Sequence, residues 1–237
     1  MIDDLRRAFA FLTVLPVGYP AGGQPGRMFA FAPLVGLCIG AAVAAVASIA
    51  SLPGDLKAFL ALLAWAALTG GLHLDGFGDA CDGLLATTAP ERRLEIMKDP
   101  RAGSWAVVGL TLLLLGKWSA LRGIDAPLLL MLPPVVGRWA MTLAAWAFPY
   151  ARTSGVGGYF REGLGAAQVA AATLTAGAGT VVLAGAPGLA ILVAALAVVI
   201  AVGRWAAARL GGGLTGDVYG ALCELTELAC LILLNGV

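Results

Sequence analysis

The chain of 237 residues contains few of the residues that a soluble domain needs. Only 12% of its residues are charged, whereas 60% are hydrophobic, and the mean hydropathy is +0.90. A soluble domain of this size leaves much of its surface in water and cannot bury so many apolar side chains. The composition therefore excludes a single soluble domain, and we predict an integral membrane protein.

Other scarcities exclude further classes of protein. The chain has one histidine and four cysteines without C-x-x-C spacing, which argues against a zinc site and against a disulfide framework. A net charge of +1 without a continuous basic stripe argues against a nucleic-acid partner. The N-terminal "MIDDLRRAFAFLTVLP" has twin arginines but no small-residue cleavage site, so we interpret residues 1–27 as a cytoplasmic, interfacial segment.

Long apolar runs are what the sequence has in abundance. Each is long enough to cross about 30 Å of hydrocarbon, and they lie near residues 28–52, 56–73, 103–123, 126–149, 168–185, 187–207 and 218–235. We predict an all-α, polytopic membrane helix bundle of about seven transmembrane helices, with six or eight possible, in a single domain over residues 1–237. The pair Gly36-x-x-x-Gly40 predicts close helix packing.

The loop charges predict an orientation in the membrane. With the N-terminus in the cytoplasm, Lys57 and Arg122 fall outside, and Lys117 and Arg138 lie within spans. The other eleven of the fifteen basic residues are cytoplasmic: Arg6, Arg7, Arg27, Arg92, Arg93, Lys98, Arg101, Arg152, Arg161, Arg204 and Arg209. The excess of cytoplasmic Lys and Arg predicts seven crossings, with the C-terminus outside.

The strongest chemical signal is the stretch "GGLHLDGFGDACDGLL" at residues 70–85. On a helix, Asp75, Asp79 and Asp82 fall within about 60° of one another, and two such charges about 6 Å apart repel by roughly 3 kcal/mol at an effective dielectric near 20. An oxygen-only ligand set next to apolar segments predicts Mg²⁺ or Mn²⁺, although a solvated helix start is an alternative. His73 would lie on the opposite face, where a structural hydrogen bond and a catalytic role both remain open.

Two further charged clusters accompany this motif. The segment "ERRLEIMKDPRAG" supplies Arg92, Arg93, Lys98 and Arg101, and acids followed by bases suggest a metal ion together with phosphate. The alternative is an anchor that contacts anionic lipid. In "GLTGDVYGALCELTEL", the acids Asp217, Glu224 and Glu227 enter the last apolar run together. They predict either a wall of the active site or an ion-pair network with Lys117 and Arg138.

These stretches resemble the cobalamin synthase family, the adenosylcobinamide-GDP ribazoletransferases. The resemblance implies a membrane enzyme that joins adenosylcobinamide-GDP to α-ribazole or its 5′-phosphate, releases GMP and requires Mg²⁺. We then expect the 5′ oxygen of α-ribazole, or of its phosphate, to attack the cobinamide-linked phosphorus. The roles implied are metal binding by Asp75, Asp79 and Asp82, catalysis by Asp82, Asp217, His73 and Lys98, and phosphate or substrate binding by Arg92, Arg93, Arg101, Lys117, Arg138 and Glu224.

The expected location is the bacterial inner membrane, with the active site on the cytoplasmic side, lipid as a partner and a homo-oligomer as a possibility. Two alternatives remain open. A CDP-alcohol phosphotransferase also has spaced aspartates, but Cys81 stands near the place where its motif has an arginine. A small-solute transporter would explain charges within spans, but it explains poorly why they gather at one membrane face.

Overall fold

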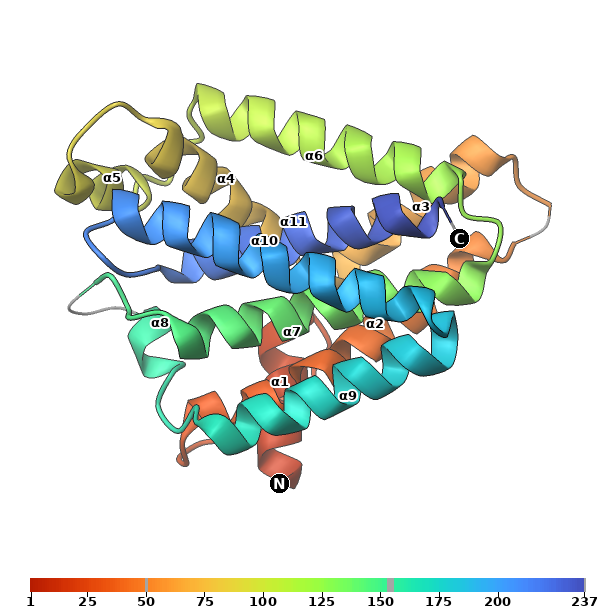
Figure 1. The fold of residues 1–237 in the computed structure, drawn as a ribbon, viewed down its shortest axis with the longest axis horizontal. Helices are drawn as coiled ribbons and strands as arrows, with labels where there is room; N and C mark the ends of the chain where they lie inside the picture. Colours follow the sequence, from red (N-terminus) through yellow and green to blue (C-terminus); the bar gives the residue numbers. More distant parts are fainter. Residues whose placement is uncertain (50, 153–155, 237) are drawn as a thin grey trace.

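The protein is a bundle in which most of the long helices run side by side, whereas the N-terminal helix lies across them (Figure 1). The computed structural model describes residues 1–49, 51–152 and 156–236, so parts of the predicted span 28–52 and of the charged loop at 150–165 lie outside the described residues. No strand occurs in the described ranges, and an isolated bridge joins Tyr150 and Leu214. The helices are α1 (Ile2–Leu12), η1 (Pro25–Phe31), α2 (Ala32–Ala47), α3 (Gly54–Thr69), α4 (Leu72–Leu85), α5 (Pro90–Ile96), α6 (Ser104–Arg122), η2 (Pro127–Met131), α7 (Leu132–Ala147), α8 (Val156–Tyr159), α9 (Ala166–Ala184), α10 (Pro187–Arg209) and α11 (Gly216–Leu234).

The helices confirm the predicted all-α membrane bundle. Among the described residues, five segments are long and apolar enough to cross a membrane: η1–α2, α6, η2–α7, α9 and α10. A sixth is possible if α3 and α4, which meet at 89°, count as one broken span. The seventh predicted span corresponds to α11, whose 19 residues include three acids. The count of seven spans stays a prediction.

The right-angle turn between α3 and α4 comes from two consecutive glycines. Gly70 has φ +61° and Gly71 has φ +70°, the left-handed region that residues with a Cβ atom rarely adopt. The two helices therefore point in different directions, although the sequence predicts a continuous run over residues 56–73. The N-terminal chain fills part of the break, because the backbone N–H of Val14 donates to the carbonyl of Leu68 over 2.9 Å.

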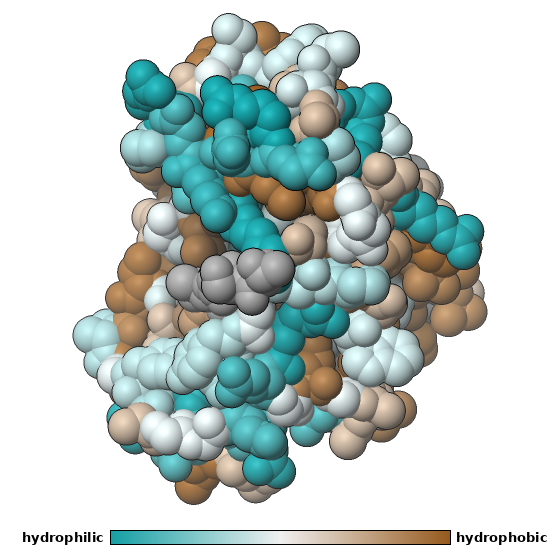
Figure 2. Space-filling model, turned by 90° about the vertical axis from the view of Figure 1, so that its left-hand side faces the viewer, coloured by the Kyte–Doolittle hydropathy of each residue, from teal (hydrophilic) through white to brown (hydrophobic). Residues whose placement is uncertain are grey.

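The two ends of the bundle differ in character. The polar end, at the left of Figure 1, carries α5, α8 and the connections between α4 and α6, α7 and α9, and α10 and α11. Figure 2 looks onto this end and shows hydrophilic residues spread across it. At the opposite end, Arg122 pairs with Asp55 and Asn235 donates to the carbonyl of Ala120 over 3.0 Å. The fold therefore contains the two groups of loops that the sequence predicts, one at each end of the bundle.

The helix α11 lies at the centre of the bundle and packs mainly against α4 and α7. Small residues bring other helices equally close. A Cβ atom on Gly36 would lie 2.4 Å from the carbonyl oxygen of Pro134, and one on Gly40 would lie 2.5 Å from the Cα atom of Met131. The Gly36-x-x-x-Gly40 pair thus packs α2 directly against the backbone of η2 and α7, as the sequence predicts.

Candidate active site

Two carboxylates meet where α4 crosses α11 near the polar end. The crossing is close because glycines face each other: a Cβ atom on Gly76 would lie 3.1 Å from the Cα atom of Asp217, and one on Gly220 would lie 3.2 Å from the carbonyl oxygen of His73. Asp75 and Asp217 therefore flank the crossing point from two helices that are distant in the sequence. Sequence patterns predicted both acids, and the structure brings them to one cavity.

This cavity has a volume of about 480 Å³, within the range of small-molecule sites, which is roughly 300–1,000 Å³. One part of its wall is charged and is formed by Asp75, Asp217, Lys98, Arg152 and Arg161. Another part is apolar and aromatic. The remaining lining residues are Phe11, Phe29, Leu72, His73, Gly76, Met141, Tyr150, Gly157, Phe160, Gly216, Tyr219 and Gly220.

The predicted aspartate triad is divided between two roles. Asp79 lies close enough to Asp217, Asp75 and Asp82 to be repelled by each of them. Asp82 instead accepts hydrogen bonds from the backbone N–H groups of Gly103 over 2.6 Å and Ala106 over 2.9 Å. It therefore caps the N-terminus of α6, whose orphan N–H groups need an acceptor.

The oxygen ligands that remain around the cavity come from two helices. Asp75 and Asp217 line it, Asp79 lies beside them, and Arg152 offsets part of their charge through a contact of 3.0 Å with Asp217. Within the described ranges, no three His, Cys, Asp or Glu side chains are close enough together to form a ready metal site. The donor set still suits a hard cation such as Mg²⁺, because all of its ligands are carboxylate oxygens.

The predicted basic segment contributes one residue to the cavity, Lys98. Arg93 is buried and donates to the carbonyls of Gly83 and Leu84 over 2.9 and 2.6 Å. It thus satisfies the C-terminus of α4 rather than facing a ligand, because the last carbonyls of a helix lack partners within it. Its predicted phosphate contact stays a prediction, and the geometry shown gives it no support.

The other two bases of the segment are exposed and paired locally. Arg92 contacts Glu95 over 2.7 Å, and Arg101 contacts Asp99 over 2.7 Å. The hydrogen bonds from Arg101 lower the pKa of Asp99 to about 2, so this pair stays charged at neutral pH. Neither arginine lines the cavity, and their role in substrate binding stays a prediction.

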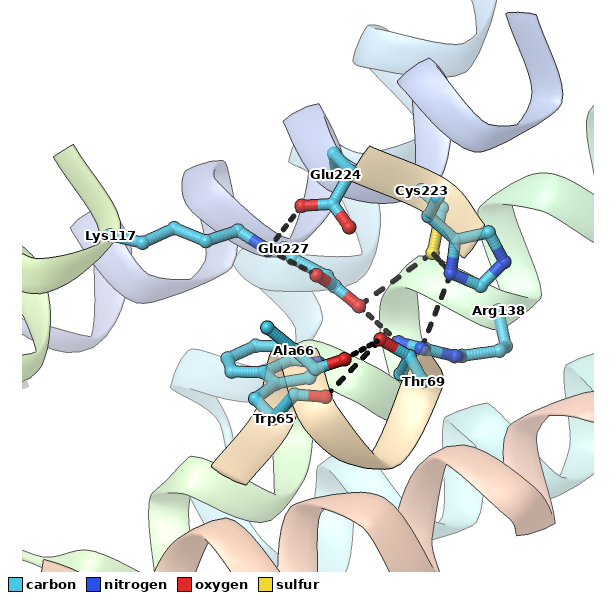
Figure 3. A network of polar contacts seen from close by, with 9 residues as sticks. Trp65, Ala66, Thr69, Lys117, Arg138, Cys223, Glu224 and Glu227 are labelled. Carbon is cyan, nitrogen blue, oxygen red and sulfur yellow. Dashed lines mark hydrogen bonds and ion pairs between the residues drawn. The ribbon is translucent and has the colours of Figure 1, made fainter. Parts of the chain in front are cut away.

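Two members of the second acidic set, Glu224 and Glu227, belong to a buried network inside the bundle (Figure 3), whereas Asp217 lines the cavity. Lys117 donates to Glu224 over 2.6 Å and also to Glu227, which in turn accepts from Arg138. Lys117 lies above the ring of Trp65, with its Nζ atom 4.4 Å from the ring centre. All four charged side chains are buried. The structure therefore favours an ion-pair network over the predicted phosphate-binding role of Lys117, Arg138 and Glu224.

His73 connects this network to the cavity. Its Nδ1 atom lies 3.3 Å from Nη2 of Arg138 and 3.7 Å from Sγ of Cys223. Because a guanidinium only donates hydrogen bonds, Nδ1 is the acceptor and the neutral ring carries its proton on Nε2. His73 also lines the cavity. Of the two roles left open for it, this geometry gives the hydrogen-bonding role a partner.

Sequence reasoning missed several cavity residues. Arg152 and Arg161 lie in the charged loop that follows α7, and the sequence alone places them only among the cytoplasmic basic residues. Tyr150 and Tyr219 carry no motif, and Phe11 belongs to a segment interpreted as an interfacial anchor. The presence of two arginines in a glycine-rich loop was the available signal, but only the fold places that loop over α4 and α11.

The fold and the cavity define a polytopic membrane protein with a carboxylate- and arginine-lined site near its polar end. Residues 4–235 match the family described as Cobalamin-5-phosphate synthase, so the chain belongs to that family, as its motifs predicted. A protein of Pseudomonas entomophila (strain L48), named adenosylcobinamide-GDP ribazoletransferase, is 42% identical over 95% of each chain.

Two further relatives carry the same name. One, from Roseiflexus sp. (strain RS-1), is 38% identical over 98% of this chain and 88% of its own. The other, from Desulforamulus reducens, is 38% identical over 99% of this chain and 96% of its own. No solved structure matches the chain.

Proposed function

We propose that this chain is an adenosylcobinamide-GDP ribazoletransferase, which joins adenosylcobinamide-GDP to α-ribazole or its 5′-phosphate and releases GMP. The observation that carries the proposal is the relative that bears this name and is 42% identical over 95% of both chains. The cavity supports it independently, because carboxylates and cations face one space next to an apolar wall. A nucleoside phosphate offers the complementary set of groups.

The family description corrects one expectation about the nucleophile. A product that retains a 5′-phosphate, as the description Cobalamin-5-phosphate synthase indicates, cannot be formed by attack through the 5′ oxygen. We therefore assign the attack to a secondary ribose hydroxyl of α-ribazole. Its oxygen forms a bond to the cobinamide-linked phosphorus, the bond from that phosphorus to the bridging oxygen breaks, and GMP leaves with that oxygen.

The cavity residues supply the groups that this displacement needs. Asp217 is our candidate for the base that accepts the hydroxyl proton, because the Asp82 oxygens already accept two backbone N–H groups. Lys98, Arg152 and Arg161 would offset the charge of the phosphates. Asp75 and Asp79 would hold Mg²⁺, which neutralises phosphate charge when bound. We further propose that the polar end faces the cytoplasm from the bacterial inner membrane.

The test uses purified protein in detergent or nanodiscs with adenosylcobinamide-GDP, α-ribazole and Mg²⁺. We expect equal amounts of GMP and of the joined product. Parallel samples receive CDP-diacylglycerol with an alcohol, and liposomes containing the protein are tested for solute uptake. A product formed only from the CDP-linked lipid, or uptake without either product, would replace the proposed function with one of those alternatives.

A further inference from the structure

We propose that Phe11 and Phe160 form a stacking surface for the base of the acceptor nucleoside and determine which bases the enzyme accepts. This inference rests on the proposed function and deepens it. It assigns a role in substrate specificity to the aromatic part of the cavity wall, whose two rings are distant in the sequence and adjacent in the fold.

The two rings form one continuous surface. Their centroids are 4.2 Å apart, with planes inclined by 37°, so no base fits between them and a ligand must lie against them. Phe11 is near the end of α1 and Phe160 directly follows α8. Both are half-buried and both line the cavity. Phe29 of η1 is buried and belongs to the same lining.

The cavity separates two kinds of chemistry, as a nucleoside phosphate does. The aromatic surface suits a planar base, because every base has a π face that can stack on an aromatic ring. Lys98, Arg152 and Arg161 suit phosphate oxygens, and Asp75 and Asp217 lie with them. The volume of about 480 Å³ suits a nucleoside, whereas the corrin macrocycle of adenosylcobinamide-GDP is too large to enter as a whole. We therefore place the acceptor, not the corrinoid, in this space.

Two buried polar atoms give a second, independent indication of a ligand. Among the described side chains, Oη of Tyr219 and Nε2 of His73 are buried without a hydrogen-bond partner, and both residues line the cavity. An unpaired buried polar group is costly and is usually satisfied in the functional state. Ribose hydroxyls and the ring nitrogens of a base are partners of matching chemistry.

The experiment measures steady-state kinetics of full-length wild-type protein and of the variants Phe160→Leu and Phe11→Leu, which keep an apolar side chain but remove the ring. We expect KM for α-ribazole to rise about tenfold, the range in which loss of a base stack acts. KM for adenosylcobinamide-GDP and kcat should remain within about twofold, since a phenylalanine ring has no donor or charge with which to bind a phosphate. The preference for a two-ring over a one-ring base should also decrease.

Matched variants control for folding. Tyr159→Leu removes the neighbouring exposed ring, which contacts Phe160 but does not line the cavity, and should leave all constants unchanged. Phe160→Tyr keeps an aromatic ring at this position, so KM for α-ribazole should stay close to the wild-type value. An unchanged KM for α-ribazole in both leucine variants, or an equal rise in KM for the corrinoid, would overturn the proposal. If wild-type protein forms no joined product, the proposed function fails, and calorimetric binding of α-ribazole to wild type and Phe160→Leu still tests the stacking surface.

Discussion

At the scale of single residues, the crossing of α4 and α11 concentrates the chemistry in Asp75 and Asp217. We predict that Asp75→Asn and Asp217→Asn each reduce kcat by about 10²–10⁴-fold, the usual contribution of a positioned acid or base. Both side chains are at least partly accessible, so the variants should elute from size exclusion like the wild type. Asp125→Asn, at the opposite end of the bundle, is the matched control. Near-normal turnover in both site variants would remove the carboxylates from the mechanism.

The same carboxylates make a prediction about metal binding. If Asp75 and Asp79 hold Mg²⁺, EDTA should abolish turnover and added Mg²⁺ should restore it. Mn²⁺ can replace Mg²⁺ at carboxylate sites, so its electron paramagnetic resonance signal reports occupancy directly. We expect Asp79→Asn to weaken Mn²⁺ binding more than Asp82→Asn, because Asp82 already caps α6. The reverse order would return Asp82 to the metal site that the sequence suggested.

Residues of the buried network should affect stability more than chemistry. Glu227 accepts from both Lys117 and Arg138, so Glu227→Gln leaves two cations with one remaining acid, Glu224. Breaking a buried ion pair typically destabilises a protein by about 3–5 kcal/mol. We expect a clear fall in the midpoint of thermal unfolding, measured from the intrinsic fluorescence of detergent-solubilised protein. Glu95→Gln, which removes an exposed pair with Arg92, should change it little.

At the scale of helices, small residues decide how closely elements approach. Gly40→Ala places a methyl group 2.5 Å from the Cα atom of Met131, so α2 must move away from η2 and α7. Overpacking of this kind costs about 1–3 kcal/mol or more. On α9, Gly177→Ala meets nothing within 4 Å and should be neutral or slightly stabilising. Equal thermal midpoints for the two variants would show that α2 packing contributes little.

Helices were also the level at which the sequence was most informative. Apolar runs gave every long helix, because a membrane span must satisfy its backbone internally and be apolar over its length. The bend at Gly70–Gly71 was missed, since two glycines in an apolar run are also compatible with a continuous helix. Asp75 and Asp217 were predicted from their spacing, whereas the capping roles of Arg93 and Asp82 depend on where α5 and α6 turn back onto α4.

At the scale of the whole molecule, the asymmetry between the two ends predicts an orientation. In a variant with the four native cysteines replaced, a thiol introduced at position 91 lies on α5 at the polar end, and one at position 125 lies at the opposite end. If the polar end is cytoplasmic, an impermeant maleimide added to intact cells should label only position 125. Labelling of position 91 alone would invert the orientation and place the cavity outside.

The right-angle turn has a consequence for how the chain is made. Neither α3, with 16 residues, nor α4, with 14, reaches the roughly 20 residues that a membrane-spanning helix needs. Neither helix should move stably from the translocon into the lipid by itself, so both depend on packing against other segments of the chain. One partner is the N-terminal segment, which is synthesised before α3 and α4. Its Val14 N–H donates to the carbonyl of Leu68 at the break. Removing residues 1–14 should therefore shorten the lifetime of the newly made protein in a pulse-chase experiment, because the half-helices would remain unassembled and open to membrane proteases.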